Sequence, residues 1–123
     1  MKIRVRTLRI GATEFKWTAE LCGYYDLGRD YHRCVRVRVW GGGKNSRKLC
    51  ADLESTSPGP WGGVPDSSYP TPSVVRRLVD YALEHGWDPT PVGGRHVLEA
   101  EDGPEIPGFQ LTGRLRMMQH LRR

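Results

Sequence analysis

The sequence predicts an α+β fold in which an antiparallel sheet of about five strands carries one main helix on a face. Two observations predict this fold. Four segments in the first half alternate apolar and polar residues, as half-buried strands do, and one later segment repeats apolar residues at helical spacing. A chain of 123 residues is long enough for one modest hydrophobic core. We therefore expect residues 1–123 to form a single domain.

The first two alternating segments predict a hairpin. Residues 2–10 change phase along the segment, which suggests a bulge near Arg6, and Gly11 then turns the chain. Residues 14–22 alternate without interruption, as a strand with one buried face does. Its inward positions are all apolar: Phe15, Trp17, Ala19 and Leu21.

Residues 31–40 and 46–53 predict two further strands joined by a tight turn. The glycine-rich segment 41–45 between them supplies the positive φ angles that such a turn requires. A glycine-rich segment that contains a lysine also resembles a phosphate-binding loop. Such a loop leads into a helix, whereas this one leads into a strand, so nucleotide binding is disfavoured.

A long connection follows these strands. Residues 55–71 are rich in proline and glycine, which excludes regular structure over most of the segment. Loops of this length are uncommon without a function. Trp61 and Tyr69 either anchor the loop onto the sheet or offer an exposed contact surface, and the sequence leaves both possibilities open.

One amphipathic helix and one more strand follow the loop. Thr71 can cap a helix whose first residue is Pro72, and this helix ends at Gly86. Residues 95–100 predict a strand after a glycine bend. Residues 112–123 place leucine and methionine at helical intervals among four arginines, which predicts a short cationic C-terminal helix.

Three short motifs punctuate the second half of the chain: Tyr69-Pro70-Thr71-Pro72 before the helix, Gly86-Trp87-Asp88-Pro89 at its end, and Pro107-Gly108-Phe109-Gln110-Leu111 near the C-terminus. With these motifs, residues 33–115 resemble a family of short uncharacterised actinobacterial proteins. The resemblance implies a fold and no known activity. It carries no catalytic or binding residue over to this chain.

Charge is distributed unevenly along the chain. Residues 1–50 carry 12 Lys and Arg against 4 Asp and Glu, residues 51–110 carry 3 against 10, and residues 111–123 carry 4 against none. Arginine outnumbers lysine by 15 to 4, which reflects either a GC-rich genome or a need for planar, bidentate cations. Because the acidic middle segment nearly cancels the basic first segment, the net charge of +5 gives weak support for a polyanionic partner.

The three cysteines, Cys22, Cys34 and Cys50, are odd in number and form no Cys-x-x-Cys pair. This pattern argues against a disulfide framework and against a structural zinc site. We predict reduced, half-buried thiols and no bound metal or other cofactor. The alternative is a metal site that gathers His32, Cys34 and cysteines from neighbouring strands.

Residues that could support catalysis are few. Asp26, Asp30 and His32 lie close together in a tyrosine-rich segment and could form an acid and base cluster, but their spacing is not specific. His85 stands at the end of the predicted helix, where the helix dipole gives it an ordinary structural role. An enzyme is therefore the least favoured hypothesis, and we predict no catalytic residue.

A second hypothesis is nucleic-acid binding by an arginine-rich sheet face. Four arginines repeat at period two in the predicted strands, beside a tryptophan: Arg4, Arg6, Arg36, Arg38 and Trp40. Arginine would meet phosphate, and the tryptophan could stack on a base. Alternatively, these charges protect an exposed sheet face from aggregation, and the acidic segment neutralises them within the fold.

The favoured hypothesis is a non-catalytic module that binds another protein or a second copy of itself. The long aromatic loop, the segments of opposite charge and the lack of a recognisable active site all fit this hypothesis. Its candidate contact residues are the four arginines and Trp40, together with Trp61 and Tyr69. The charged N-terminus lacks the apolar stretch of a signal peptide, and no segment reaches about 20 apolar residues, so we expect a cytoplasmic protein without membrane contact.

Overall fold

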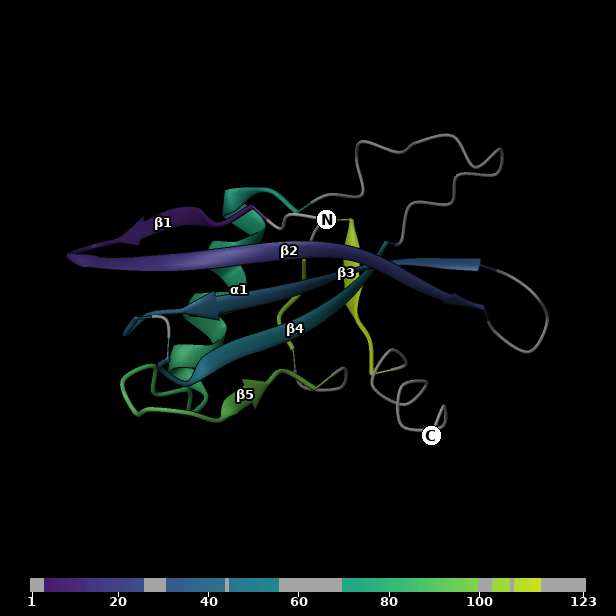
Figure 1. Ribbon diagram of the computed structural model, residues 1–123. Helices are drawn as coiled ribbons and strands as arrows, with labels where there is room; N and C mark the ends of the chain where they lie inside the picture. The colour runs from purple at the N-terminus through teal and green to yellow at the C-terminus, as the bar shows by residue number, and fades with distance from the viewer. Residues whose placement is uncertain are drawn as a thin grey trace.

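The computed structural model describes residues 4–25, 31–43, 45–55, 70–99, 103–106 and 108–113, apart from the side chains of residues 23–25, 31–33 and 55. The elements in chain order are β1 (Arg6–Ile10), β2 (Thr13–Tyr25), β3 (Tyr31–Trp40), β4 (Lys48–Ser55), α1 (Pro72–Glu84), β5 (Arg95–Val97) and β6 (Phe109–Leu111). The strands form one sheet, and α1 lies behind it in the view of Figure 1. The α+β class is therefore confirmed.

The sheet has the strand order β1-β2-β3-β4-β5, and β6 also pairs with β4. Every pair is antiparallel except β4 with β5, which is parallel. β5 pairs with residues 48–50 of β4, and β6 pairs with residues 53–55, so the two short strands share one edge of β4. The prediction of an antiparallel sheet of about five strands needs two corrections, because the described sheet has six strands and is mixed.

The parallel pair follows from the place of the helix in the chain. α1 lies between β4 and β5, so the chain returns along the sheet before β5 begins. Parallel neighbouring strands need a crossover connection, and the segment with α1 supplies one. The helix and both strands were predicted from the sequence, but their parallel pairing was not.

Strand boundaries differ from the predicted ones. β1 begins at Arg6 and pairs with β2 in regular register, so the described part of this strand contains no bulge. β5 ends at Val97, three residues before the predicted end. Residues 114–123 of the predicted C-terminal helix and residues 56–69 of the long loop lie outside the described residues.

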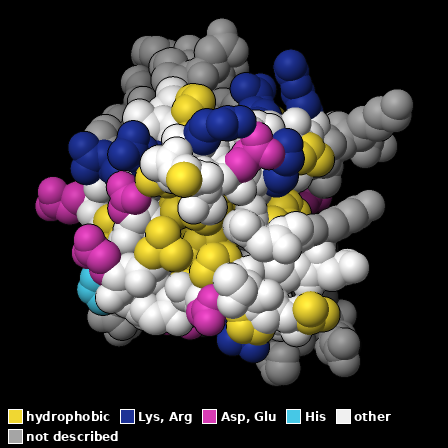
Figure 2. Space-filling model, turned by 90° about the vertical axis from the view of Figure 1, so that its left-hand side faces the viewer, with side chains coloured by type: hydrophobic (Ala, Val, Ile, Leu, Met, Phe, Trp, Pro, Cys, Tyr) yellow, Lys and Arg dark blue, Asp and Glu magenta, His cyan; other side chains and the backbone are white. Residues whose placement is uncertain are grey.

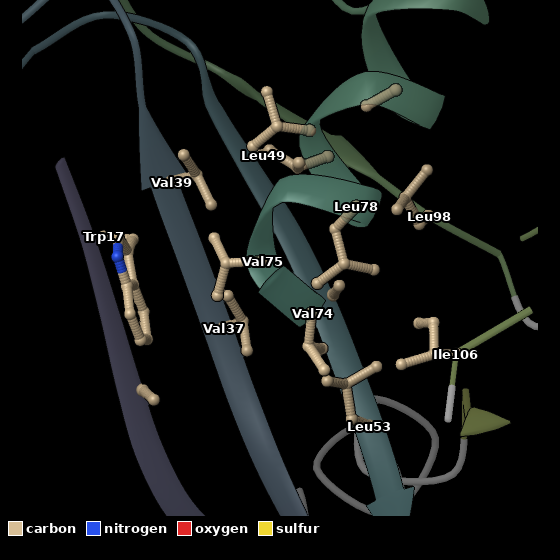
Figure 3. Close-up of a cluster of buried hydrophobic side chains, with 14 of the residues drawn as sticks. Trp17, Val37, Val39, Leu49, Leu53, Val74, Val75, Leu78, Leu98 and Ile106 are labelled. Atoms are coloured by element: carbon tan, nitrogen blue, oxygen red, sulfur yellow. The ribbon is translucent and has the colours of Figure 1, made fainter. Parts of the chain in front are cut away.

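A cluster of buried apolar side chains lies between the sheet and α1 (Figure 3). The sheet contributes alternate residues of β2, β3 and β4: Phe15, Trp17, Ala19, Val35, Val37, Val39, Leu49, Ala51 and Leu53. The helix contributes one stripe: Val74, Val75, Leu78, Val79 and Ala82. The period of two on the strands and of 3.6 on the helix placed all of these residues inward in the sequence. Leu21, which the same alternation placed inward, is instead 54% exposed.

The predicted start of α1 is confirmed, and the helix ends at Glu84, two residues before the predicted end at Gly86. The Oγ1 of Thr71 accepts a hydrogen bond from the backbone N of Val74 at 3.4 Å, and Pro72 is the first helical residue. Gly86 follows the helix with a φ of 106°, a conformation that few other residues adopt. The described residues contain no helix that is both long enough and apolar enough to cross a lipid bilayer.

The segment after α1 packs on the turn between β3 and β4. The indole Nε1 of Trp87 donates to the carbonyl oxygen of Arg47 at 3.0 Å, and the backbone N of Arg47 donates to the carbonyl oxygen of Pro91 at 2.7 Å. Trp87 is buried, and its ring contacts Phe15 with 6.0 Å between centroids. Trp87 therefore covers the end of the helix and ties it to the sheet.

Gly41 and Gly42 are important in this turn mainly because they have no side chain. A Cβ atom on Gly42 would lie 2.7 Å from the carbonyl oxygen of Pro89, and one on Gly41 would lie 2.9 Å from the Pro89 Cβ. In the described part of the turn, only Gly43 has a positive φ, at 106°. The prediction that this segment supplies positive φ angles thus holds for Gly43, whereas Gly41 and Gly42 permit close approach of the segment after α1.

Candidate functional site

The side of the sheet away from α1 is the first candidate surface, and we call it the outer face. It carries even-numbered residues of β2, β3 and β4, which register in three rows: Thr18, Arg38 and Cys50; Glu20, Arg36 and Asp52; Cys22, Cys34 and Glu54. Four of these nine residues are buried: Thr18, Cys34, Cys50 and Asp52. The outer face is therefore not simply a solvent-exposed surface of charged side chains.

Its two arginines are held by carboxylates. The guanidinium of Arg36 donates from Nε to one Asp52 oxygen at 2.8 Å and from a terminal nitrogen to the other at 3.2 Å, with side chains only 15% and 4% exposed. Arg38 donates to Glu20 at 3.2 Å, in a pair that is 26% and 43% exposed. The hydrogen bonds that Arg36 donates to Asp52 raise the pKa of Arg36 above its ordinary value. Both guanidinium groups are thus already paired within the fold.

These ion pairs help to decide between nucleic-acid binding and neutralisation within the fold as the reason for the arginine pattern. Asp52 belongs to the acidic segment 51–110, so that segment supplies the partner of Arg36. The partner of Arg38 is Glu20, from the basic first segment. Neutralisation within the fold therefore accounts for both outer-face arginines, although only one pair spans the two segments.

The outer face also carries all three cysteines, as thiols. Burial raises the pKa of Cys22 and of Cys50, and it raises the pKa of Cys34 from 9.0 to about 12, with help from the charge of Glu54. Thiols with such pKa values are protonated at neutral pH and are weak nucleophiles. Within the described parts of the chain, no three His, Cys, Asp or Glu side chains are grouped so that they could hold a metal ion.

The remaining predicted arginines lie elsewhere. Arg6 is paired in register with Trp17, which faces the core, and its guanidinium carbon lies 5.7 Å from the centre of the Trp17 ring. Arg6 is therefore on the α1 side of the sheet, and the expectation that the arginines share one face does not hold. Arg4 is exposed and precedes β1, and Trp40 is half-buried in register with Lys16.

Other predicted residues fall outside the described part of the structure. Trp61 and Tyr69 of the long loop lie there, so both interpretations of them stay open. Asp26, Asp30 and the side chain of His32 lie there as well, so the acid and base cluster stays a prediction. His85 donates from Nδ1 to the carbonyl oxygen of Tyr81 at 2.8 Å, which fits the structural role expected at the end of the helix.

A second candidate surface joins the edge strand β1 to α1. Leu8, Ile10 and Tyr81 are partly buried there and pack against the core, and we call these three side chains the β1–α1 seam. The Tyr81 ring stacks on His85 with 3.9 Å between centroids. Figure 2 shows the molecule from the side on which β1 lies, where hydrophobic side chains gather near the centre and charged side chains surround them. This arrangement resembles the apolar centre and polar rim of protein interfaces.

Sequence reasoning missed the seam. The alternation in β1 identified Leu8 and Ile10 as apolar strand residues, but the order of the strands was not known. Since β1 is the end strand of the sheet, with β2 as its only described partner, its apolar residues are left partly exposed. An N-terminal hairpin with a short first strand was the one signal that could have suggested an edge.

No protein-family model, no curated protein and no solved structure matches this chain. The resemblance to the actinobacterial family therefore stays a prediction. Function has to be argued from the two surfaces alone.

Proposed function

We propose that this chain is a non-catalytic protein-interaction module, and that a second copy of the chain pairs with it along β1 and the β1–α1 seam. One observation carries the proposal. Among the described residues the sheet ends at β1, and the apolar side chains beside that edge are only partly buried. A contact there would cover apolar surface and satisfy the backbone groups of the edge at the same time.

The sequence of β1 suits pairing with itself. Two antiparallel copies centred on Leu8 would place Leu8 opposite Leu8, Arg6 opposite Ile10, and Thr7 opposite Arg9. No two arginines then face each other directly, and like charges in directly opposite positions are destabilising. The guanidinium of Arg9 also forms an ion pair with the carboxylate of Glu14, at 3.2 Å. The edge charges are therefore compatible with a second copy.

Nucleic-acid binding is the competing proposal, and the observed ion pairs weaken it. Binding a polyanion depends on cations that are available to phosphates. Arg36 and Arg38 would have to leave Asp52 and Glu20 first, and Arg6 lies on the other side of the sheet. A small enzyme has less support still, because burial raises the pKa of all three cysteine thiols, which makes them weak nucleophiles at neutral pH.

Substitution of Leu8 by lysine tests the proposal. Leu8→Lys puts a charge at the centre of the proposed contact, so we expect self-association to weaken about 100-fold, the effect of losing a central contact of about 2–3 kcal/mol. Light scattering of the eluting protein measures the particle mass. The matched control is Val92→Lys, which changes an apolar side chain that is 84% exposed in the loop before β5.

The expected result is a mass of two chains for the unsubstituted protein and for Val92→Lys, and of one chain for Leu8→Lys at the same concentration. Circular dichroism checks that Leu8→Lys keeps its fold. An unsubstituted protein with the mass of one chain at every concentration would overturn the proposal, as would a folded Leu8→Lys protein with the mass of two chains.

A further inference from the structure

Two cysteines of the outer face lie directly opposite each other. In the register of β2 and β3, Cys22 pairs with Cys34. Directly opposite residues of antiparallel strands have Cα atoms about 4.5–5.5 Å apart, and disulfides need a Cα separation of about 4.4–6.8 Å. The backbone of the two strands therefore already holds these cysteines at a distance that a disulfide can bridge.

The surroundings of the three thiols differ. Cys22 is half-buried, and its sulfur lies 3.7 Å from the carbonyl oxygen of Glu20, whereas Cys34 is fully buried. Cys50 is buried too, but its register neighbour on β3 is Arg38, so no thiol stands directly opposite it. Cys22 and Cys34 thus form one adjacent pair, in which Cys22 is the more accessible thiol. Cys50 serves as an internal control.

We propose that Cys22 and Cys34 form a reversible dithiol–disulfide site, whose co-substrate is a low-molecular-weight disulfide such as oxidised glutathione. The site lies at the base of the β2–β3 ribbon, which in Figure 1 extends beyond the other described strands. The bond would tie these two strands together across residues 23–33. This inference is independent of pairing through β1, which lies at the other end of β2.

The reaction balances with one molecule of oxidised glutathione. The Cys22 thiolate attacks one glutathione sulfur, which forms a mixed disulfide and releases one glutathione thiolate. The Cys34 thiolate then attacks the Cys22 sulfur, which forms the Cys22–Cys34 bond, breaks the mixed disulfide and releases the second glutathione thiolate. The two cysteine protons pass to the two glutathione thiolates. The protein loses two electrons, and oxidised glutathione gains them.

The charges around the pair predict how the rate depends on pH. Among the described residues, Glu20, Arg36 and Asp52 act on Cys22, and Glu54, Asp52 and Arg36 act on Cys34. Burial dominates, and it raises the pKa of both thiols. Because only the thiolate attacks a disulfide, we expect oxidation to be slow at neutral pH and to quicken about tenfold for each pH unit between about 7 and 9.

The test uses the full, reduced chain incubated with oxidised glutathione, acidified to stop exchange and analysed by mass spectrometry. We expect the protein to lose the mass of two hydrogen atoms, one thiol to remain titratable, and a non-reduced peptide map to join Cys22 to Cys34. Cys22→Ser leaves two cysteines, and we expect both to remain titratable thiols with no internal bond. Cys50→Ser should form the bond as the unsubstituted chain does.

Three results would overturn the inference: a protein that keeps three titratable thiols at pH 9 in excess oxidised glutathione, a stable mixed disulfide at Cys22 that Cys34 does not resolve, or a bond that involves Cys50. The peptide map is made on the unsubstituted chain. The inference therefore stays testable even if a cysteine substitution prevents folding.

Discussion

The two faces of the sheet are built from the same three strands and are held by different forces. On the α1 side, every position of β3 that faces the core is a valine, and the side chains of α1 close over them. On the outer face, the alternate positions of the same strand carry a cysteine and two arginines whose charges are paired with carboxylates. Close packing of apolar side chains stabilises the α1 side. On the outer face, ion pairs and the protonation of the cysteine thiols determine the stability.

This comparison explains why the outer face is a poor guide to function. Arginine at every second position suggests an exposed cationic surface when the sequence is considered alone. In the fold, the neighbouring strands place Asp52 and Glu20 beside these arginines. The arginine pattern therefore reflects ion pairs that form within the sheet. The surface that we propose for a partner is the β1–α1 seam, whose apolar side chains are only partly buried.

The largest expected effect comes from the α1 side. Leu78→Ala should lower the free energy of unfolding by about 4 kcal/mol, because Leu78 is fully buried against the sheet and the substitution leaves a cavity. Denaturant unfolding measures the change. The control on the same helix is Leu83→Ala, whose side chain is 41% exposed and should cost about 0.5 kcal/mol or less. Equal losses for the two variants would mean that α1 does not close over the sheet in this way.

A smaller effect is expected on the outer face. Asp52→Asn should cost about 3 kcal/mol, because it leaves the mostly buried Arg36 guanidinium without its counter-charge. Glu20→Gln is the control, and it should cost about 1 kcal/mol or less because the Arg38–Glu20 pair is partly exposed. Adding Arg36→Met to Asp52→Asn should restore part of the loss. A double variant whose loss is the plain sum of the single losses would show that the pair is not coupled.

The pH dependence distinguishes the two faces further. Since the pKa of the Cys34 thiol is raised from 9.0 to about 12, the unfolded chain loses this proton first, and stability falls as the pH rises from about 9 to about 12. Each pH unit in this window should cost at most about 1.4 kcal/mol from this thiol. Comparing unfolding of the unsubstituted chain with Cys34→Ala isolates the contribution. A variant that loses stability as steeply as the unsubstituted chain would contradict it.

Much of the fold could be predicted from the sequence because alternation and helical spacing are local. They identified the four long strands, the inward residues and the capped helix. They predicted a strand at residues 95–100 but not its parallel pairing as β5, and they missed the three-residue β6, because pairing between distant strands leaves no local signal. Leu21 shows a second limit: it follows the inward alternation of β2, yet it is 54% exposed.

The candidate site was less predictable than the fold. The arginines and cysteines were identified by type, but their partners depend on the register of three strands, which composition and spacing do not fix. Arg6 was assigned to the face of Arg36 and Arg38, whereas its pairing with Trp17 puts it on the α1 side. The seam requires knowledge of which strand lies at the edge, so the sequence showed its residues but not their role.

Sedimentation velocity of the unsubstituted chain at low ionic strength, with a labelled single-stranded oligonucleotide present, tests the central claim most directly. It reports both the mass of the protein particle and whether the label moves with it. Contact through β1 predicts a particle of two chains with the oligonucleotide sedimenting separately. A particle of one chain that carries the oligonucleotide would contradict the account and would make the arginines the functional surface.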